Sequence, residues 1–130
     1  MDKKDLSSLY FLNVEIQREK RRLAELESAA TDTSAKISGL PHVGKKTDKT
    51  ALAAEIADTR SIIEAKVKAS VVEYNRLIRY IETIDDPMIR EIMRLRHLDG
   101  KSWRNVAKGL GGNNTEDGVR KAHDRFLKKN

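Results

Sequence analysis

The sequence contains no cysteine. Disulfides, thiol catalysis and cysteine-based zinc sites are therefore excluded. Proline occurs twice and glycine seven times, and four of the glycines lie between residues 100 and 112. Because proline and glycine are the residues that most often interrupt a helix, the chain before residue 100 is free to form long helices.

Long apolar runs are also missing. The first residues, MDKKDLSS, are polar, unlike a signal peptide. No apolar stretch approaches the roughly 20 residues that a membrane-spanning helix needs. We therefore expect a cytoplasmic protein that makes no membrane contact.

Residues that carry chemistry are sparse. The three histidines, His42, His97 and His123, have no metal-ligand spacing. Asp85 and Asp86 are adjacent carboxylates without a nearby histidine, and Asp86 is placed to cap a helix that starts at Pro87. We expect a protein that is not an enzyme, with no metal and no cofactor.

Charge is plentiful and unevenly distributed. Hydrophobic residues make up 38% of the chain and charged residues 35%, a balance that suits long exposed helices. The formal net charge is +6, and residues 85–130 hold 11 Lys and Arg against 7 Asp and Glu. The C-terminal third thus carries most of the positive excess, which is typical of a segment that contacts phosphates.

Two long amphipathic helices are expected before residue 85, over about 5–35 and 50–84, with a polar linker at 36–50 that contains Gly39, Pro41 and Gly44. Both have apolar residues at alternating steps of three and four, the period of a helix–helix seam. The seam of the first helix, interrupted at Glu19, is Leu9, Leu12, Ile16, Leu23, Leu26 and Ala30. That of the second is Ile56, Arg60, Ile63, Val67, Ser70, Tyr74, Leu77, Ile81 and Ile84.

The C-terminal segment, residues 85–130, predicts three shorter helices. An apolar helix follows Pro87, and Ser102 and Thr115 are placed as N-caps of two more. After Ser102, apolar residues recur on one helix face, beginning with Trp103, which we expect to be a core residue. The glycines at 109, 111 and 112 are expected to supply the left-handed turn between the last two helices. This layout is a helix-turn-helix.

The segment MIREIMRLRHLDGKSWRNVAKGLGGNNTEDGVRKAHDRFL, residues 88–127, resembles the DNA-binding region four of bacterial sigma factors. It is more similar still to small phage and prophage transcription regulators that carry such a region. Two features depart from that pattern: the turn is longer, and the last helix begins with Glu116, Asp117 and Gly118. The resemblance implies sequence-specific binding of double-stranded DNA and suggests contact with RNA polymerase.

The last helix is expected to face the DNA. With Val119 set inward, the outward positions are Asp117, Lys121, Asp124 and Lys128, and Arg120 and Arg125 flank them. Lys121 and Arg125 can approach guanine edges or phosphates. Asp124 can accept from a cytosine amino group or orient Arg120. The residues expected to contact DNA are Arg94, Arg104, Asn113, Asn114, Thr115, Arg120, Lys121, Asp124, Arg125 and Lys128. Arg94 is either a phosphate contact or part of a solvated face. Asn113 and Asn114 either hydrogen-bond the DNA backbone or only shape the turn.

The predicted fold class is all-α: a long antiparallel, coiled-coil-like hairpin (1–84) followed by a three-helix helix-turn-helix head (85–130). The hairpin is expected to serve assembly or partner binding. Apolar residues outside its seam, Ile62, Val71, Val72 and Ile78, favour a homodimer. Two alternatives remain open at this point. One is a DNA-packaging adaptor resembling a small terminase subunit, and the other is a helical adaptor between proteins that does not bind DNA.

Overall fold

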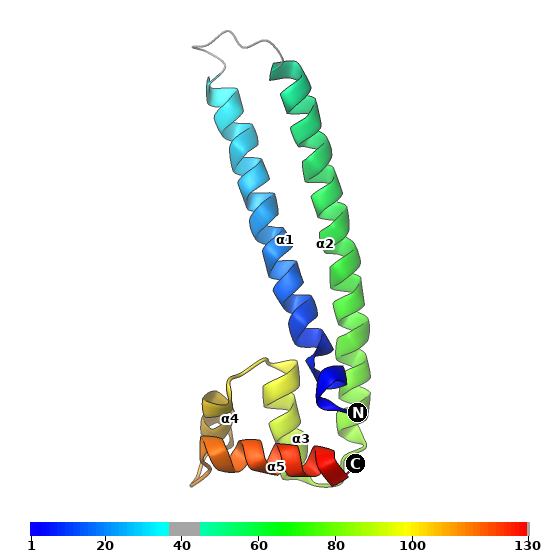
Figure 1. Cartoon of the computed structure of the whole chain (residues 1–130), viewed down its shortest axis with the longest axis vertical. Coiled ribbons are helices and arrows are strands. Elements are labelled where there is room, and N and C mark those ends of the chain that lie inside the picture. The colour runs from blue at the N-terminus through cyan, green and yellow to red at the C-terminus, as the bar shows by residue number, and fades with distance from the viewer. Residues whose placement is uncertain (37–44, 130) are drawn as a thin grey trace. The chain divides into compact units, whose positions relative to one another are not determined.

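The computed structural model describes residues 1–36 and 45–129, and over these ranges the chain is all-α, as predicted (Figure 1). One π-helical turn, η1, directly continues the third α-helix. The elements are α1 (Lys3–Lys36), α2 (Lys45–Glu82), α3 (Pro87–Met93), η1 (Arg94–Leu98), α4 (Trp103–Leu110) and α5 (Glu116–Lys129).

The two long helices extend beyond their predicted bounds. α2 begins at Lys45, whereas the sequence indicated a linker up to about Thr50. Helix elongation costs little once a turn has formed, so polar residues of ordinary helix propensity are included. Residues 37–44 of the predicted linker lie outside the described residues. α2 ends in a tightened turn, in which the Ile84 N–H donates to the Ile81 carbonyl at 3.0 Å.

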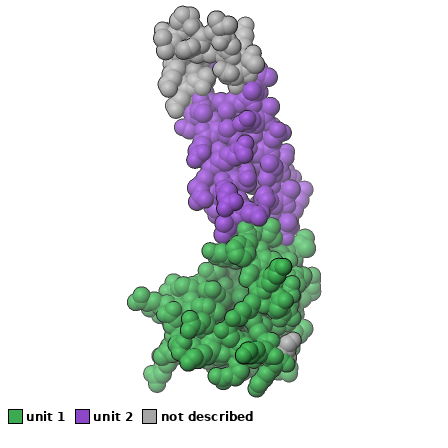
Figure 2. All heavy atoms as spheres, in the orientation of Figure 1, with its two compact units in different colours: residues 1–12, 70–130 green, residues 13–69 purple. Residues whose placement is uncertain are grey.

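The chain divides into two compact units whose boundaries lie inside the long helices (Figure 2). Unit 1 comprises residues 1–12 and 70–130, and unit 2 comprises residues 13–69. The sequence placed a boundary at residues 84 and 85 instead. The last turns of α2 and the first turns of α1 therefore belong with the three short helices.

Unit 2 contains two antiparallel helical arms (Figure 1). The predicted seam is correct at Ile56 and Ile63, which are half-buried, but wrong at Arg60, which is exposed. Thr59 takes the inner position and is buried; its hydroxyl donates to the Glu55 carbonyl at 2.8 Å. A threonine can occupy such a position because its one polar group is satisfied within its own helix.

The same shift of one residue recurs further along α2. Lys66, rather than Val67, is the half-buried residue, and its Nζ lies 2.7 Å from Glu15 Oε2 of α1. Its aliphatic stem packs at the seam while its ammonium group reaches a carboxylate. In unit 1, Glu73 likewise takes the inner position predicted for Tyr74, and it pairs with Arg76. The predicted seam is therefore off by one residue at Arg60, Val67 and Tyr74. It is correct at Leu77, Ile81 and Ile84, which are buried.

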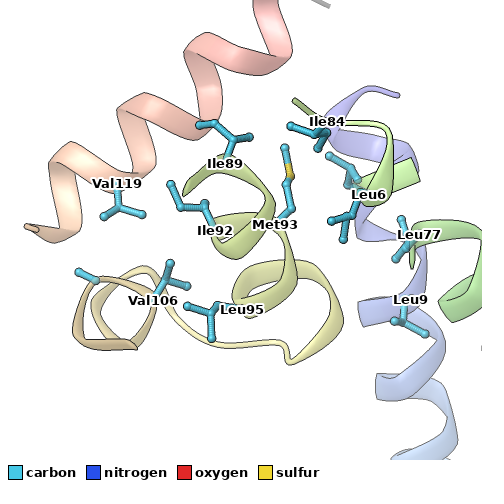
Figure 3. Close-up of a cluster of buried hydrophobic side chains, with 12 residues drawn as sticks. Leu6, Leu9, Leu77, Ile84, Ile89, Ile92, Met93, Leu95, Val106 and Val119 are labelled. Carbon is cyan, nitrogen blue, oxygen red and sulfur yellow. The ribbon is translucent and has the colours of Figure 1, made fainter. Parts of the chain in front are cut away.

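Unit 1 is organised around one hydrophobic core to which every one of its helices contributes (Figure 3). Ile92 and Met93 of α3 are fully buried at its centre. Leu6 and Leu77, from the two long helices, are fully buried beside them. The buried core residues are Leu6, Leu9, Leu77, Ile81, Ile84, Ile89, Ile92, Met93, Leu95, Val106, Ala107 and Val119.

All three predicted N-caps are confirmed. Asp86 Oδ1 accepts from the Met88 N–H at 2.9 Å, with Pro87 at the first position of α3. Ser102 Oγ accepts from the Asn105 N–H at 3.3 Å. Thr115 Oγ1 accepts from the Gly118 N–H at 3.0 Å. Each cap satisfies a backbone donor that the first turn of a helix would leave unpaired.

The glycines of the turn serve two purposes. Gly111 and Gly112 have φ of 73° and 63°, as the sequence predicted for residues that end a helix. Gly109 was expected to do the same, but it lies inside α4. A Cβ at Gly109 would meet Leu95 Cδ1 at 3.0 Å, so its role is close packing. At Gly118, a Cβ would lie 2.9 Å from Thr115 Oγ1, which explains a glycine next to that cap.

η1 closes one hydrogen bond wider than an α-helix: the Asp99 N–H donates to the Arg94 carbonyl at 3.0 Å. η1 ends at Leu98, and Gly100, whose φ is 69°, follows; the Lys101 N–H returns to the Leu95 carbonyl at 3.0 Å. This turn fixes the positions of Arg96 and His97.

We predict that Leu6→Ala destabilises the three short helices, although Leu6 lies far from them in sequence. Leu6 is fully buried, and replacing such a side chain by alanine lowers the free energy of unfolding by about 2–5 kcal/mol. Urea unfolding followed by the fluorescence of Trp103, the only tryptophan, measures the loss. Leu26→Ala, at a half-buried position of unit 2, is the matched control and should change this transition less. An unchanged Trp103 transition in Leu6→Ala would show that the short helices form their core alone.

Candidate nucleic-acid interface

α5 has one buried and one exposed face. Val119 and His123 point into unit 1, and both are buried. Lys121 and Lys128 are exposed, as the helical period from Val119 predicted, and the flanking Arg125 is exposed as well. Asp124, which was also expected to point outward, is half-buried. The exposed face is therefore rich in cations along its C-terminal two-thirds.

A hollow of about 670 Å³ lies along this face. Four residues predicted to contact DNA line it together, and the first residues of the chain contribute to its wall. The lining residues are Asp2, Lys3, Lys121, Asp124, Arg125, Leu127 and Lys128. Sequence reasoning missed Lys3, because nothing local indicates that the start of the chain packs beside its last helix.

The acidic start of α5 is paired within the helix. Asp117 Oδ1 lies 2.7 Å from Arg120 Nη2, and its Oδ2 lies 3.0 Å from Lys121 Nζ. The hydrogen bond and charge of Lys121, followed by the charge of Arg120, lower the pKa of Asp117. Among the described residues, Arg125 and Lys128 form no ion pair. These two side chains are thus the cations of the hollow that have no competing carboxylate.

Asp124 holds the two ends of the chain together. Its Oδ1 lies 3.0 Å from Lys3 Nζ and 3.0 Å from His123 Nδ1. Burial acts to raise the pKa of Asp124, but the hydrogen bonds from His123 and Lys3 outweigh it, and the pKa is lower than usual. The expectation that Asp124 orients Arg120 is wrong, because Arg120 pairs with Asp117.

The predicted turn residues have mainly local contacts. Asn114 Nδ2 donates to the Gly111 carbonyl at 2.9 Å, and Thr115 caps α5, so these two side chains shape the turn. Asn113 is exposed. Of the alternatives left open for Asn113 and Asn114, the turn-shaping one holds for Asn114.

The two remaining predicted residues do not line the hollow. Arg104 is exposed on the first turn of α4. Arg94 is half-buried on η1 and forms ion pairs with Glu82 of α2 and, at 3.9 Å, with Glu91. Arg90, one turn earlier, donates to the Ile84 carbonyl at 2.6 Å. The arginines of this outer face thus connect α3 and η1 to the end of α2.

A histidine pair lies behind the exposed face of α5. His97 Nε2 of η1 and His123 Nε2 lie 2.8 Å apart, so one of the two must donate and the other accept. The Asp124 carboxylate can only accept, so His123 Nδ1–H donates to it, and in the neutral pair His97 Nε2–H donates to His123 Nε2. The sequence does not indicate this pair, because its members come from different elements.

Trp103 packs beside this pair rather than in the centre of the core. Its ring meets that of His123 edge-on, with centroids 4.8 Å apart, and the Arg96 guanidinium lies 4.5 Å above it. Trp103 is half-buried and contacts the core, so its predicted structural role is confirmed in part. Burial, followed by the charges of His123 and Arg96, lowers the pKa of His97 to about 4. Burial also lowers the pKa of His123.

Within the ranges that the structure describes, no three His, Asp or Glu side chains converge in a way that could hold a metal ion. No helix in these ranges combines the length and apolarity needed to cross a membrane. The chain matches no protein-family model, no curated protein and no solved structure.

We predict that the pair of His97 and His123 makes the protein sensitive to mild acid. The unfolded chain takes up a proton at His97 near pH 6.5, whereas the folded protein resists it until about pH 4. The stability present above pH 6.5 should therefore fall as the pH drops toward 4, by about 3 kcal/mol for this group. Urea unfolding across this window measures the loss.

His97→Gln is the comparison, because its amide keeps a donor for His123 but does not titrate. It should reduce the dependence of unfolding free energy on pH between these values. The same dependence in both proteins would mean that His97 is not protected from protons by the fold.

Proposed function

We propose that this protein binds double-stranded DNA in a sequence-specific manner, as a transcription regulator of the phage and prophage type. The observation that carries the proposal is the hollow along α5, in which Lys121, Arg125 and Lys128 gather with Lys3. An exposed helix that follows a tight turn has the width to enter a major groove, where cationic side chains reach phosphates and guanine edges. Such a regulator acts in the cytoplasm.

The contacts within the interface suggest a separate role in DNA binding for each side chain. Arg125 and Lys128, which form no ion pair among the described residues, are assigned to phosphates. Lys3, fixed by Asp124 at 3.0 Å, is assigned to the phosphate backbone at the edge of the same groove. Asp117 holds Arg120 and Lys121 in place, and it repels phosphates that approach without a matching base edge. This arrangement favours selectivity over overall affinity.

Contact with RNA polymerase, which the resemblance to sigma region four suggests, belongs to the same proposal. The two other functions weighed from the sequence predict different outcomes. A DNA-packaging adaptor would form a ring of many subunits, and an adaptor between proteins would bind no duplex.

We further propose that two copies associate through α2. Val71 and Tyr74 are 53% and 40% exposed, and with Ile78 they follow the i, i+3, i+7 spacing of a helix–helix seam. α2 already buries Leu77 and Ile81 against α1, so this is a second, adjacent seam on one helix. A second copy fits because one small DNA-binding module buries only roughly 600–1,000 Å² on DNA, and pairing two modules doubles that area.

We predict that Lys121→Ala combined with Arg125→Ala weakens duplex binding and reduces its salt dependence. Loss of the phosphate contact assigned to Arg125 should lower the slope of log affinity against log salt by about 1, and loss of Lys121 should lower the affinity further. Selection from random duplexes supplies the ligand, and affinity at several salt concentrations measures the change. Lys68→Ala combined with Arg79→Ala removes the same charge from exposed positions of α2 and should leave binding nearly intact. If the selection retains no duplex, or if the α5 variant binds with the same affinity as the parent protein, the proposed interface is refuted.

We predict that sedimentation at micromolar concentration gives a dimer, and that Val71→Ser with Tyr74→Ser gives a monomer. The footprint of the dimer should cover two half-sites about one helical turn apart. Val72 was also among the apolar residues that favoured a homodimer, but it lies on another side of α2 from Val71 and Tyr74. Val72→Ser is therefore the control and should leave the dimer intact. If the parent protein stays monomeric at all concentrations, the proposed association through α2 is wrong. If it forms a large ring, the packaging adaptor is favoured.

A further inference from the structure

An exposed aromatic pair lies on α1, beside η1 and the turn that follows it. Tyr10 and Phe11 are 55% and 59% exposed, and their rings meet edge-on with centroids 5.3 Å apart. The neighbouring Leu6 and Leu9 are buried in the core, so the two rings add nothing to that packing. Two large aromatic side chains held together at the surface mark a site of interaction.

The rings form one wall of a groove of about 440 Å³. The opposite wall comes from η1 and the turn that follows it. The lining residues are Ser7, Tyr10, Phe11, Arg96, His97, Gly100 and Ser102. Gly100 leaves the turn side open, since a Cβ there would meet nothing within 4 Å.

Most polar groups of the groove are already engaged. The Ser7 hydroxyl donates to the Lys3 carbonyl at 2.7 Å, and Ser102 Oγ caps α4. His97 bonds to His123 and is neutral at ordinary pH, because burial lowers its pKa to about 4. Recognition of a charged ligand therefore falls to Arg96.

Arg96 is held ready for an anion. Its guanidinium lies 4.5 Å over the Trp103 ring, and its Nη1 donates to the Lys101 carbonyl at 3.0 Å. Among the described residues it has no carboxylate partner. Lys101 and Arg104 are exposed nearby in sequence and outnumber the single Asp99. A fixed guanidinium with free N–H groups matches the two oxygens of a carboxylate.

We propose that this groove docks an acidic peptide segment of a partner protein. An aromatic or leucine side chain of the segment packs on Tyr10 and Phe11, and a carboxylate pairs with Arg96. Single-stranded nucleic acid fits less well, because successive bases need parallel ring faces. Here the two rings stand at 80° to each other, which suits one apolar anchor. The inference does not depend on DNA binding by α5.

The test is a selection of random short peptides on the whole protein, followed by affinity measurements with a resynthesised enriched peptide. The enriched peptides should combine Asp or Glu with Phe, Trp or Leu. Phe11→Ser should lower affinity roughly tenfold or more, as loss of a central aromatic contact does. Val72→Ser, which removes an exposed apolar side chain from α2, should leave affinity unchanged.

Arg96→Lys tests the anion contact, because it keeps the charge but loses the paired donors. It should lower the affinity for acidic peptides. Thermal unfolding followed by Trp103 fluorescence checks that the fold is retained. Phe11 is exposed, so Phe11→Ser tests the groove even if Arg96→Lys alters the fold. Enrichment of peptides without acidic residues, no enrichment at all, or equal affinity in Phe11→Ser would overturn the proposal. If Phe11→Ser instead dissociates a self-associated form of the protein, the groove binds a second copy. If Phe11→Ser selectively abolishes binding of a single-stranded oligonucleotide, the groove binds nucleic acid.

Discussion

The burial of Leu6 and Leu9 against Leu77, Ile81 and Ile84 is the constraint on which unit 1 depends. α3 and α4 contain only seven and eight residues, so they present few side chains to a core. The ends of the long helices complete that core. Lys3 precedes Leu6 by one turn, and burial of Leu6 therefore also fixes Lys3 beside Asp124. One hydrophobic contact thus sets both the stability of the short helices and the composition of the cationic hollow.

Features that depend on neighbours in sequence could be predicted. Asp86, Ser102 and Thr115 are correct as N-caps because capping needs only the residue and the first turn that follows it. The exposed face of α5 is correct because one buried residue, Val119, sets the direction of all others on a regular helix. The all-α class follows from the same local periodicity, so these predictions required no knowledge of tertiary contacts.

Features that depend on distant residues could not be predicted. The inner positions of α2 at Thr59 and Lys66 are stabilised by a backbone carbonyl and by Glu15, and neither partner is visible in an apolar pattern. The contact of Lys3 with Asp124 joins residues at opposite ends of the chain. The hydrogen bond of His97 to His123 forms between η1 and α5. Composition recorded the presence of these residues, but only the fold shows which of them meet.

The π-helical turn of η1 has a consequence for how the sequence can vary in length. Such a turn accommodates one residue more than an α-helical turn, and so it has the form of a single-residue insertion. A deletion within Arg94–Leu98 would restore an ordinary α-helix and rotate the residues that follow by about 100° relative to α3. Arg96 would then leave the Trp103 ring, and His97 would leave His123. Homologous chains that are one residue shorter at this point should therefore also lack Trp103 and His123. Chains that keep the inserted residue should keep both.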